Sequence, residues 1–97
     1  MKMKKKIPTE EELSALNVKS WGTWSKEVSE FDWSYGDTET CYVLEGEVEV
    51  TDSDTGEKIE FKKGDLVQFE KGLKCIWNVK RPIRKHFSFD LNFGEID

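Results

Sequence analysis

Cysteine, proline and histidine are scarce in this 97-residue sequence, which has two cysteines, two prolines and one histidine. Cys41 and Cys75 are too few and too far apart to form a disulfide scaffold or a zinc knuckle. No export signal precedes them, so we expect both to be reduced thiols and the protein to be cytoplasmic.

Long hydrophobic runs are also missing. No apolar stretch follows the basic start MKMKKKIP, so we expect neither a signal peptide nor a transmembrane span, and no membrane partner. The net charge of -5 argues against a nucleic-acid partner, because such proteins usually present a basic face. We interpret the four early lysines as a frayed, solvated terminus.

Aromatic residues are what the chain has in quantity. Only 36% of the residues are apolar, yet 12% are aromatic, including four Trp and six Phe. A chain of this length makes one domain with a small core, which large aromatic side chains fill efficiently.

One short helix is predicted near the start, from Thr9 to Leu16. Thr9 and Glu12 have the spacing of a capping box, in which each side chain bonds the other residue's backbone N–H. We therefore divide the chain into an N-terminal extension, residues 1–20, and a barrel domain, residues 21–97.

After Trp21 the pattern changes to a period of two, which is typical of strands. Short candidate strands follow one another, separated by turn residues such as Gly46, Gly64 and Pro82. Many short strands with regular turn signals indicate an all-β sandwich or barrel. The predicted strands are 21–28, 31–36, 40–45, 47–52, 57–61, 65–70, 75–80 and 84–91.

Residues 64–79 read GDLVQFEKGLKCIWNV, and their glycine spacing resembles the second motif of the cupin superfamily, G(X)5PXG(X)2H(X)3N. Gly64 and Gly72 match the glycines, while Cys75 stands in place of the metal-binding histidine. The resemblance implies an all-β fold: a cupin double-stranded β-helix, or jelly-roll barrel, with the one short N-terminal α-helix.

The first cupin motif, G(X)5HXH(X)3-4E(X)6G, is matched in part. Glu39 and Gly46 have the required spacing, while Trp33 and Tyr35 occupy the two histidine positions. The segments WGTWSKEVSEFDWSY, ETCYVLEGEVEVT, GDLVQFEKGLKCIWNV and RPIRKHFSF also resemble the small stand-alone cupins related to ureidoglycine aminohydrolase domains.

The resemblance implies a metal site, but the ligand residues do not support one. Of the four ligand positions only Glu39 keeps a family ligand, and the indole nitrogen of Trp33 is a donor only. We therefore expect no metal cofactor. The fallback set is Glu39, Cys75 and His86, which would hold zinc, or the manganese of the namesake activity, if His86 turned inward.

Without a metal, the motif positions predict a pocket. Trp33, Tyr35, Glu39, Cys75 and Trp77 are expected to point into one cavity, because their parity matches the inward ligand positions of the motifs. His86 is added as a further candidate ligand-binding residue. An aromatic lining with a few polar groups is typical of small-molecule sites.

Three functions follow, and the sequence leaves them open. The leading hypothesis is a metal-free cupin that binds a small polar or anionic molecule. The alternative is an enzyme of the ureidoglycine aminohydrolase-like or isomerase type, with Glu39 and either Cys75 or His86 as catalytic residues. The third is a structural or partner-binding module. We expect a homodimer that covers an exposed strand edge. We interpret Arg84 and Lys85 as solvated, with the alternative that one of them binds an anionic ligand.

Overall fold

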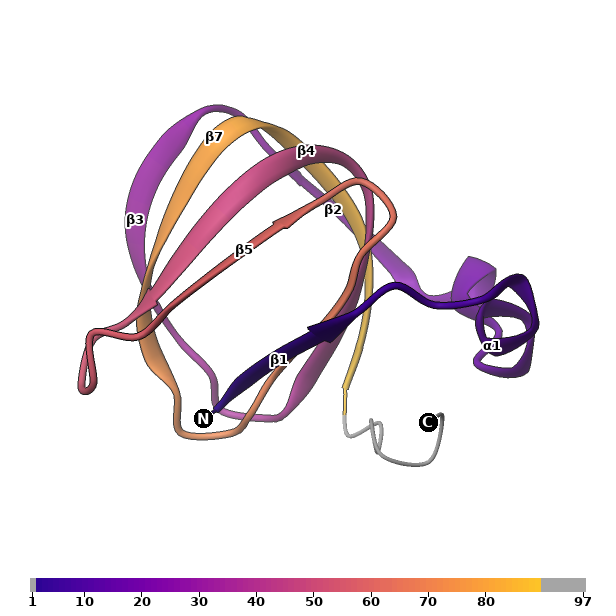
Figure 1. The fold of residues 1–97 in the computed structure, drawn as a ribbon, viewed down its shortest axis with the longest axis horizontal. Coiled ribbons are helices and arrows are strands. Elements are labelled where there is room, and N and C mark those ends of the chain that lie inside the picture. Colours follow the sequence, from indigo (N-terminus) through magenta and orange to yellow (C-terminus); the bar gives the residue numbers. More distant parts are fainter. Residues whose placement is uncertain (1, 90–97) are drawn as a thin grey trace.

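A computed structural model describes residues 2–89. Within this range the strands form one antiparallel sheet that curves around a common interior (Figure 1). The strand order is β1-β6-β4-β7-β2, with β3 paired to β7 and β5 paired to β4. The strands are β1 (Met3–Lys6), β2 (Gly22–Lys26), β3 (Ser29–Ser34), β4 (Glu39–Asp52), β5 (Lys58–Lys62), β6 (Leu66–Phe69) and β7 (Lys74–Phe89). The predicted all-β barrel is confirmed.

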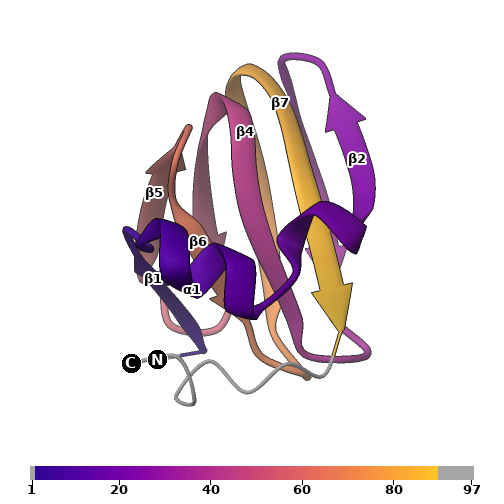
Figure 2. The same ribbon diagram turned by 90° about the vertical axis from the view of Figure 1, so that its right-hand side faces the viewer.

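The predicted helix is present as α1 (Glu10–Ala15), followed by a 3-10 turn, η1 (Val18–Ser20). Thr9 caps α1, and both hydrogen bonds of the capping box with Glu12 form. The helix contributes no buried side chain and lies outside the sheet (Figure 2). No helix among the described residues is long and apolar enough to cross a membrane.

The basic N-terminus is part of the sheet. β1 pairs with β6 in the register Met3↔Phe69, and the Met3 side chain is 1% exposed. The expectation of a frayed, solvated terminus is therefore wrong for residues 3–6. Burial of Met3 beside Phe69, together with the backbone bonds to β6, orders the segment despite its lysines.

β4 and β7 are long, bent strands, where the sequence predicted two short strands in each case. The turn expected at Gly46 is a bulge inside β4, which shifts its register against β7. Inward residues of β4 are odd-numbered before the bulge (Cys41, Val43) and even-numbered after it (Val48, Val50). One strand thereby serves both halves of the barrel.

Gly46 makes the bulge feasible, so replacing it should be costly. Its φ is +104°, and an added Cβ would lie 2.4 Å from the Pro82 carbonyl oxygen. We expect Gly46→Ala to lower the free energy of unfolding by about 2–4 kcal/mol, from backbone strain and steric overlap. Gly36→Ala is the control, because nothing lies within 4 Å of its added Cβ. Equal urea midpoints for the two variants would contradict this role of Gly46.

Aromatic rings fill the barrel interior. Tyr35 stacks on Phe69 at 5.0 Å between ring centroids, and Phe69 and Phe61 each contact Trp77 at 5.6 Å. Valines from β4, β6 and β7 pack around these rings. Aromatic rings and valines therefore fill this part of the interior.

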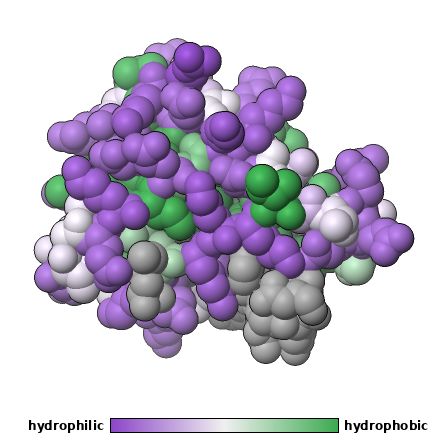
Figure 3. Space-filling model, viewed as in Figure 1, coloured by the Kyte–Doolittle hydropathy of each residue, from purple (hydrophilic) through white to green (hydrophobic). Residues whose placement is uncertain are grey.

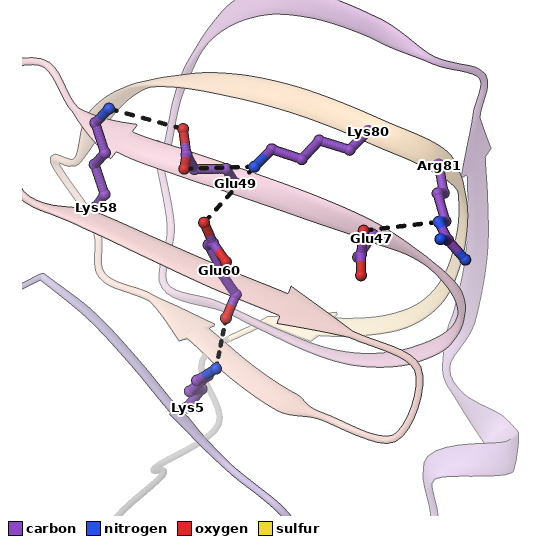
Figure 4. Close-up of polar contacts among 7 residues, drawn as sticks. All are labelled: Lys5, Glu47, Glu49, Lys58, Glu60, Lys80 and Arg81. Carbon is purple, nitrogen blue, oxygen red and sulfur yellow. Dashed lines mark hydrogen bonds and ion pairs between the residues drawn. The ribbon is translucent and has the colours of Figure 1, made fainter.

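The outer face carries charge. Glu49 lies between Lys58 and Lys80, at 3.8 and 3.7 Å, and Glu60 contacts Lys80 at 3.6 Å (Figure 4). Figure 3 has the same viewpoint as Figure 1 and shows hydrophilic residues over much of this face. Such exposed pairs contribute at most about 1 kcal/mol each, so they favour solubility more than stability.

Candidate functional site

A pocket opens among the aromatic side chains of β2, β3 and β7. It has a volume of about 220 Å³, below the roughly 300–1,000 Å³ of typical ligand pockets, so it suits a small molecule. Trp33 and Phe89 are each about half exposed (50% and 52%) beside the open space. The residues that line it are Trp24, Phe31, Trp33, Tyr35, Glu39, Trp77, Lys85, Phe87 and Phe89.

Two charged residues in this lining form a buried ion pair. Lys85 Nζ donates to Glu39 Oε2 at 2.7 Å, and the two residues are 5% and 9% exposed. β4 and β7 bring them together, because the register pairs Val43 with Lys85 and Glu39 with Phe89. The inner-face alternation of both strands turns the two side chains toward each other.

Cys41 completes a three-residue cluster with this pair. Its thiol donates to Glu39 Oε2 at 3.0 Å, and its sulfur accepts from Lys85 Nζ at 3.2 Å. The ammonium also lies 5.0 Å from the ring centroid of Trp24 and 4.9 Å from that of Trp77. The cation is thus held by a carboxylate, a sulfur and two ring faces.

The protonation states follow from burial and from these contacts. Burial alone lowers the pKa of Lys85, but the neighbouring Cys41 and Glu39 outweigh it and raise that pKa above its usual value. Burial raises the pKa of Cys41 to about 12 and raises that of Tyr35 well above its usual value. Near neutral pH the cluster therefore contains an ammonium and a neutral thiol, and Tyr35 in the same lining is a neutral phenol.

Comparison with known protein families gives one match. Residues 13–87 match the EutQ-like cupin domain family. The chain belongs to this family. The search of curated proteins found no match to this chain, which is called this cupin below.

Solved structures support the assignment. A DUF861 family protein from Thermotoga maritima is 55% identical, with a TM-score of 0.87, over 90% of this cupin and 98% of that chain. The EutQ protein of Clostridium difficile is 25% identical, with a TM-score of 0.64, over 70% of this cupin and 52% of that chain. A putative ethanolamine utilization protein Q from Salmonella typhimurium is 26% identical, with a TM-score of 0.63, over 70% and 54% of the two chains. This cupin therefore aligns with about half the length of the two EutQ proteins.

The structure brings together four of the six predicted ligand-binding residues: Trp33, Tyr35, Glu39 and Trp77 all line the pocket. Trp77 Nε1 donates to the Tyr35 hydroxyl at 3.2 Å, which fixes both rings beside Glu39. These four residues therefore share one site.

Cys75 lies elsewhere. It is buried at the start of β7, and its thiol donates to the Trp33 carbonyl oxygen at 3.6 Å. It lines a second surface depression with Asp32, Ser53 and Lys74, and this depression shares only Trp33 with the pocket. Cys75 has the inward parity, but it is paired with Trp33 in the β3–β7 register. The Cys75 thiol therefore bonds the Trp33 backbone and does not reach the pocket.

His86 lies on the outer face of β7. Its Nδ1 is 3.2 Å from the Thr23 hydroxyl, and its ring borders a groove between the sheet and the α1–η1 segment. The physical reason is alternation, because Lys85 and Phe87 occupy the inward positions on either side of it.

The fallback metal set therefore does not assemble, because Glu39, Cys75 and His86 face three different environments. Among residues 2–89, no group of three or more His, Cys, Asp or Glu side chains is placed to hold a metal ion. The carboxylate at the family's ligand position already accepts from an ammonium. These donors do not fit the metal that the cupin fold implies.

Lys85 is the site residue that the sequence analysis misplaced. The interpretation of Lys85 as solvated is wrong, since it is among the most buried charged residues described. A signal was present: in PIRKHFSF, Ile83, Lys85 and Phe87 alternate with Arg84 and His86. Two apolar neighbours of the same parity place Lys85 on the inner face.

Both thiols should be chemically inert in the folded protein. Burial raises the pKa of Cys75 to about 11, so its thiolate fraction at pH 8 is about one in a thousand. We expect neither Cys41 nor Cys75 to react with iodoacetamide at pH 8 until urea unfolds the chain. Mass spectrometry after alkylation, with free cysteine as the control, measures this. Rapid labelling of native Cys75 would restore it as a candidate nucleophile.

Proposed function

We propose that this cupin binds a small, ring-bearing organic molecule in the aromatic pocket and needs no metal to do so. The observation that carries the proposal is the buried Lys85–Glu39 pair in the pocket lining. Glu39 holds the carboxylate position of the first cupin motif, and the Lys85 ammonium uses that carboxylate as a metal ion would. In this site the cation beside the carboxylate is therefore the Lys85 side chain and not a metal ion.

The chemistry of the lining favours binding over covalent catalysis. Lys85 has a raised pKa and is protonated near neutral pH, so it lacks the lone pair that a nucleophilic amine needs. Cys41 is a neutral thiol. The enzymatic alternative with Cys75 or His86 has no support at this pocket, because neither residue lines it.

Some finer expectations stay predictions. These are the relationship to ureidoglycine aminohydrolase domains, the division into residues 1–20 and 21–97, the homodimer and the cytoplasmic location. A part in ethanolamine utilization is not proposed, because the chain aligns with about half the length of the EutQ proteins.

A ligand screen with a pocket variant tests the proposal. Single-ring compounds should raise the melting temperature of the wild-type protein, because a ligand at 100 times its dissociation constant adds about 2.7 kcal/mol to the free energy of unfolding. The shift should be lost in Trp33→Ala, which removes one exposed wall of the pocket. It should persist in Val28→Ala, an exposed apolar position outside the lining.

The same screen is run with and without a chelator. Equal shifts in both conditions are expected. Shifts that require added divalent metal, or that survive Trp33→Ala unchanged, would contradict the proposal.

A further inference from the structure

We infer that the pocket selects an uncharged ligand whose polar end presents a hydrogen-bond donor beside an acceptor, as a carboxamide does. The inference deepens the proposed function and rests on it. It follows from counting the hydrogen bonds that Glu39 and Lys85 already make, and from the charge that their pairing leaves.

Glu39 has one carboxylate oxygen to spare. Its Oε2 accepts from both Lys85 Nζ and Cys41 Sγ. Its Oε1 accepts no hydrogen bond from residues 2–89. Every fully buried side-chain oxygen of the described residues does have a hydrogen-bond partner, so an oxygen without one is not fully buried. Oε1 therefore retains exposure, and Glu39 lines the pocket. A ligand N–H or O–H can donate to it.

Lys85 has one N–H to spare. An ammonium carries three, of which one points to Glu39 Oε2 and one to Cys41 Sγ. No further acceptor among residues 2–89 bonds Nζ; the remaining contacts are the ring faces of Trp24 and Trp77. A ligand carbonyl oxygen would be a stronger acceptor than a ring face for this third hydrogen.

The spare donor and the spare acceptor belong to residues 2.7 Å apart at their charged atoms. A carboxamide offers the complementary pair, with its N–H toward Glu39 Oε1 and its C=O toward Lys85 Nζ. One planar group can therefore meet both spare sites at once.

Charge excludes the obvious competitors. The Lys85–Glu39 pair is neutral as a unit, so it exerts little net attraction on an ion. A carboxylate that approached Lys85 would also meet Glu39, and an ammonium that approached Glu39 would also meet Lys85. Each would lose its hydration on entering an aromatic pocket without a free counter-charge. The anionic ligand of the leading sequence hypothesis is thus disfavoured.

The body of the ligand follows from size and lining. An apolar cavity of about 150 Å³ in another protein takes benzene, so about 220 Å³ admits one ring with a small substituent. Edge and face contacts with Trp33, Phe31 and Phe87 would suit such a ring. Benzamide is therefore a suitable probe.

Calorimetric titration of the wild-type protein at pH 7 with four matched probes tests the inference. The probes are benzamide, benzoate, benzylammonium and toluene. Benzamide should bind at least about tenfold more tightly than either ion, because each ion meets a like charge. It should also exceed toluene, which cannot use the spare donor and acceptor.

Glu39→Gln provides the sharper test, because it leaves the Lys85 ammonium without its counter-charge. Benzoate should then bind more tightly than benzamide. Glu45→Gln is the matched control, since Glu45 pairs with Arg84 at 3.1 Å on the exposed surface and does not line the pocket. Circular dichroism checks that each variant is folded, and the wild-type series decides the matter if Glu39→Gln does not fold.

The outcomes separate the two proposals. A wild-type preference for benzoate or benzylammonium, or equal binding of benzamide and toluene, overturns the inference and leaves the proposed binding function standing. Failure of all four probes to bind overturns the inference, and failure of every compound in the wider ring screen overturns the proposed function as well.

Discussion

Lys85→Ala should lower the free energy of unfolding by about 3–5 kcal/mol, the usual cost of breaking a buried ion pair on one side. The substitution leaves Glu39, a buried residue, without its ammonium partner, and it also removes the cation from two tryptophan faces. Urea denaturation followed by tryptophan fluorescence measures the loss.

Arg84→Ala is the matched control for Lys85→Ala. Arg84 is the neighbouring basic residue and pairs with Glu45, but both side chains are more than half exposed, at 53% and 62%. Its removal should cost about 0–1 kcal/mol. Comparable losses for the two variants would show that Lys85 is not buried against Glu39.

A double substitution separates the charge pair from packing. Glu39→Leu combined with Lys85→Met replaces two charges with apolar groups of similar length. Because burying ions is costly, the double variant should recover most of the loss seen in Lys85→Ala, or exceed the wild type. A double variant as unstable as the sum of its single variants would contradict a direct pairing.

Alkaline pH should destabilise the protein, and Cys41 should account for much of the effect. Burial raises the pKa of this thiol from 9.0 to about 12 in the folded state. Its stabilising contribution is therefore complete below about pH 9 and is lost as the pH rises toward 12. The expected slope is about 1.4 kcal/mol per pH unit for one thiol, because the unfolded chain releases a proton that the folded chain retains.

Cys41→Ala tests the origin of this slope. The free energy of unfolding, measured by urea titration between pH 7 and 10.5, should fall less steeply above pH 9 in the variant. Cys75, whose pKa is raised to about 11, contributes in the same direction and leaves a residual slope. Parallel profiles for wild type and Cys41→Ala would show that the Cys41 thiol does not titrate as described.

Local pattern was enough to predict an all-β sandwich or barrel, and the resemblance to the cupin motifs added the jelly-roll barrel and four of the nine residues that line the pocket. The parity of Trp33, Tyr35 and Glu39 placed them on one face, and the structure gathers them around one cavity. The capping box of Thr9 and Glu12 likewise placed the helix correctly. These features depend on neighbours within a few residues, which is what a sequence displays directly.

What the sequence did not predict depends on long-range register. The bulge at Gly46 reverses which residues of β4 face inward, and the predicted strands 40–45 and 47–52 are therefore one continuous strand. The bulge depends on the close approach of Gly46 to Pro82 of β7. The β1 strand exists because Met3 is buried beside Phe69, a contact between residues far apart in the sequence. Alternation places Lys85 on the inner face, but its partner Glu39 comes from β4, 46 residues earlier in the chain.

Metal content is the most direct test of the central claim, that Lys85 supplies the cation at this cupin site. The protein is purified without an affinity tag and without chelators, and manganese, iron, nickel and zinc are measured per chain by elemental analysis. The account predicts amounts far below one ion per chain for the wild type, and no change for Glu39→Ala. Near-stoichiometric metal that is lost in Glu39→Ala would contradict it.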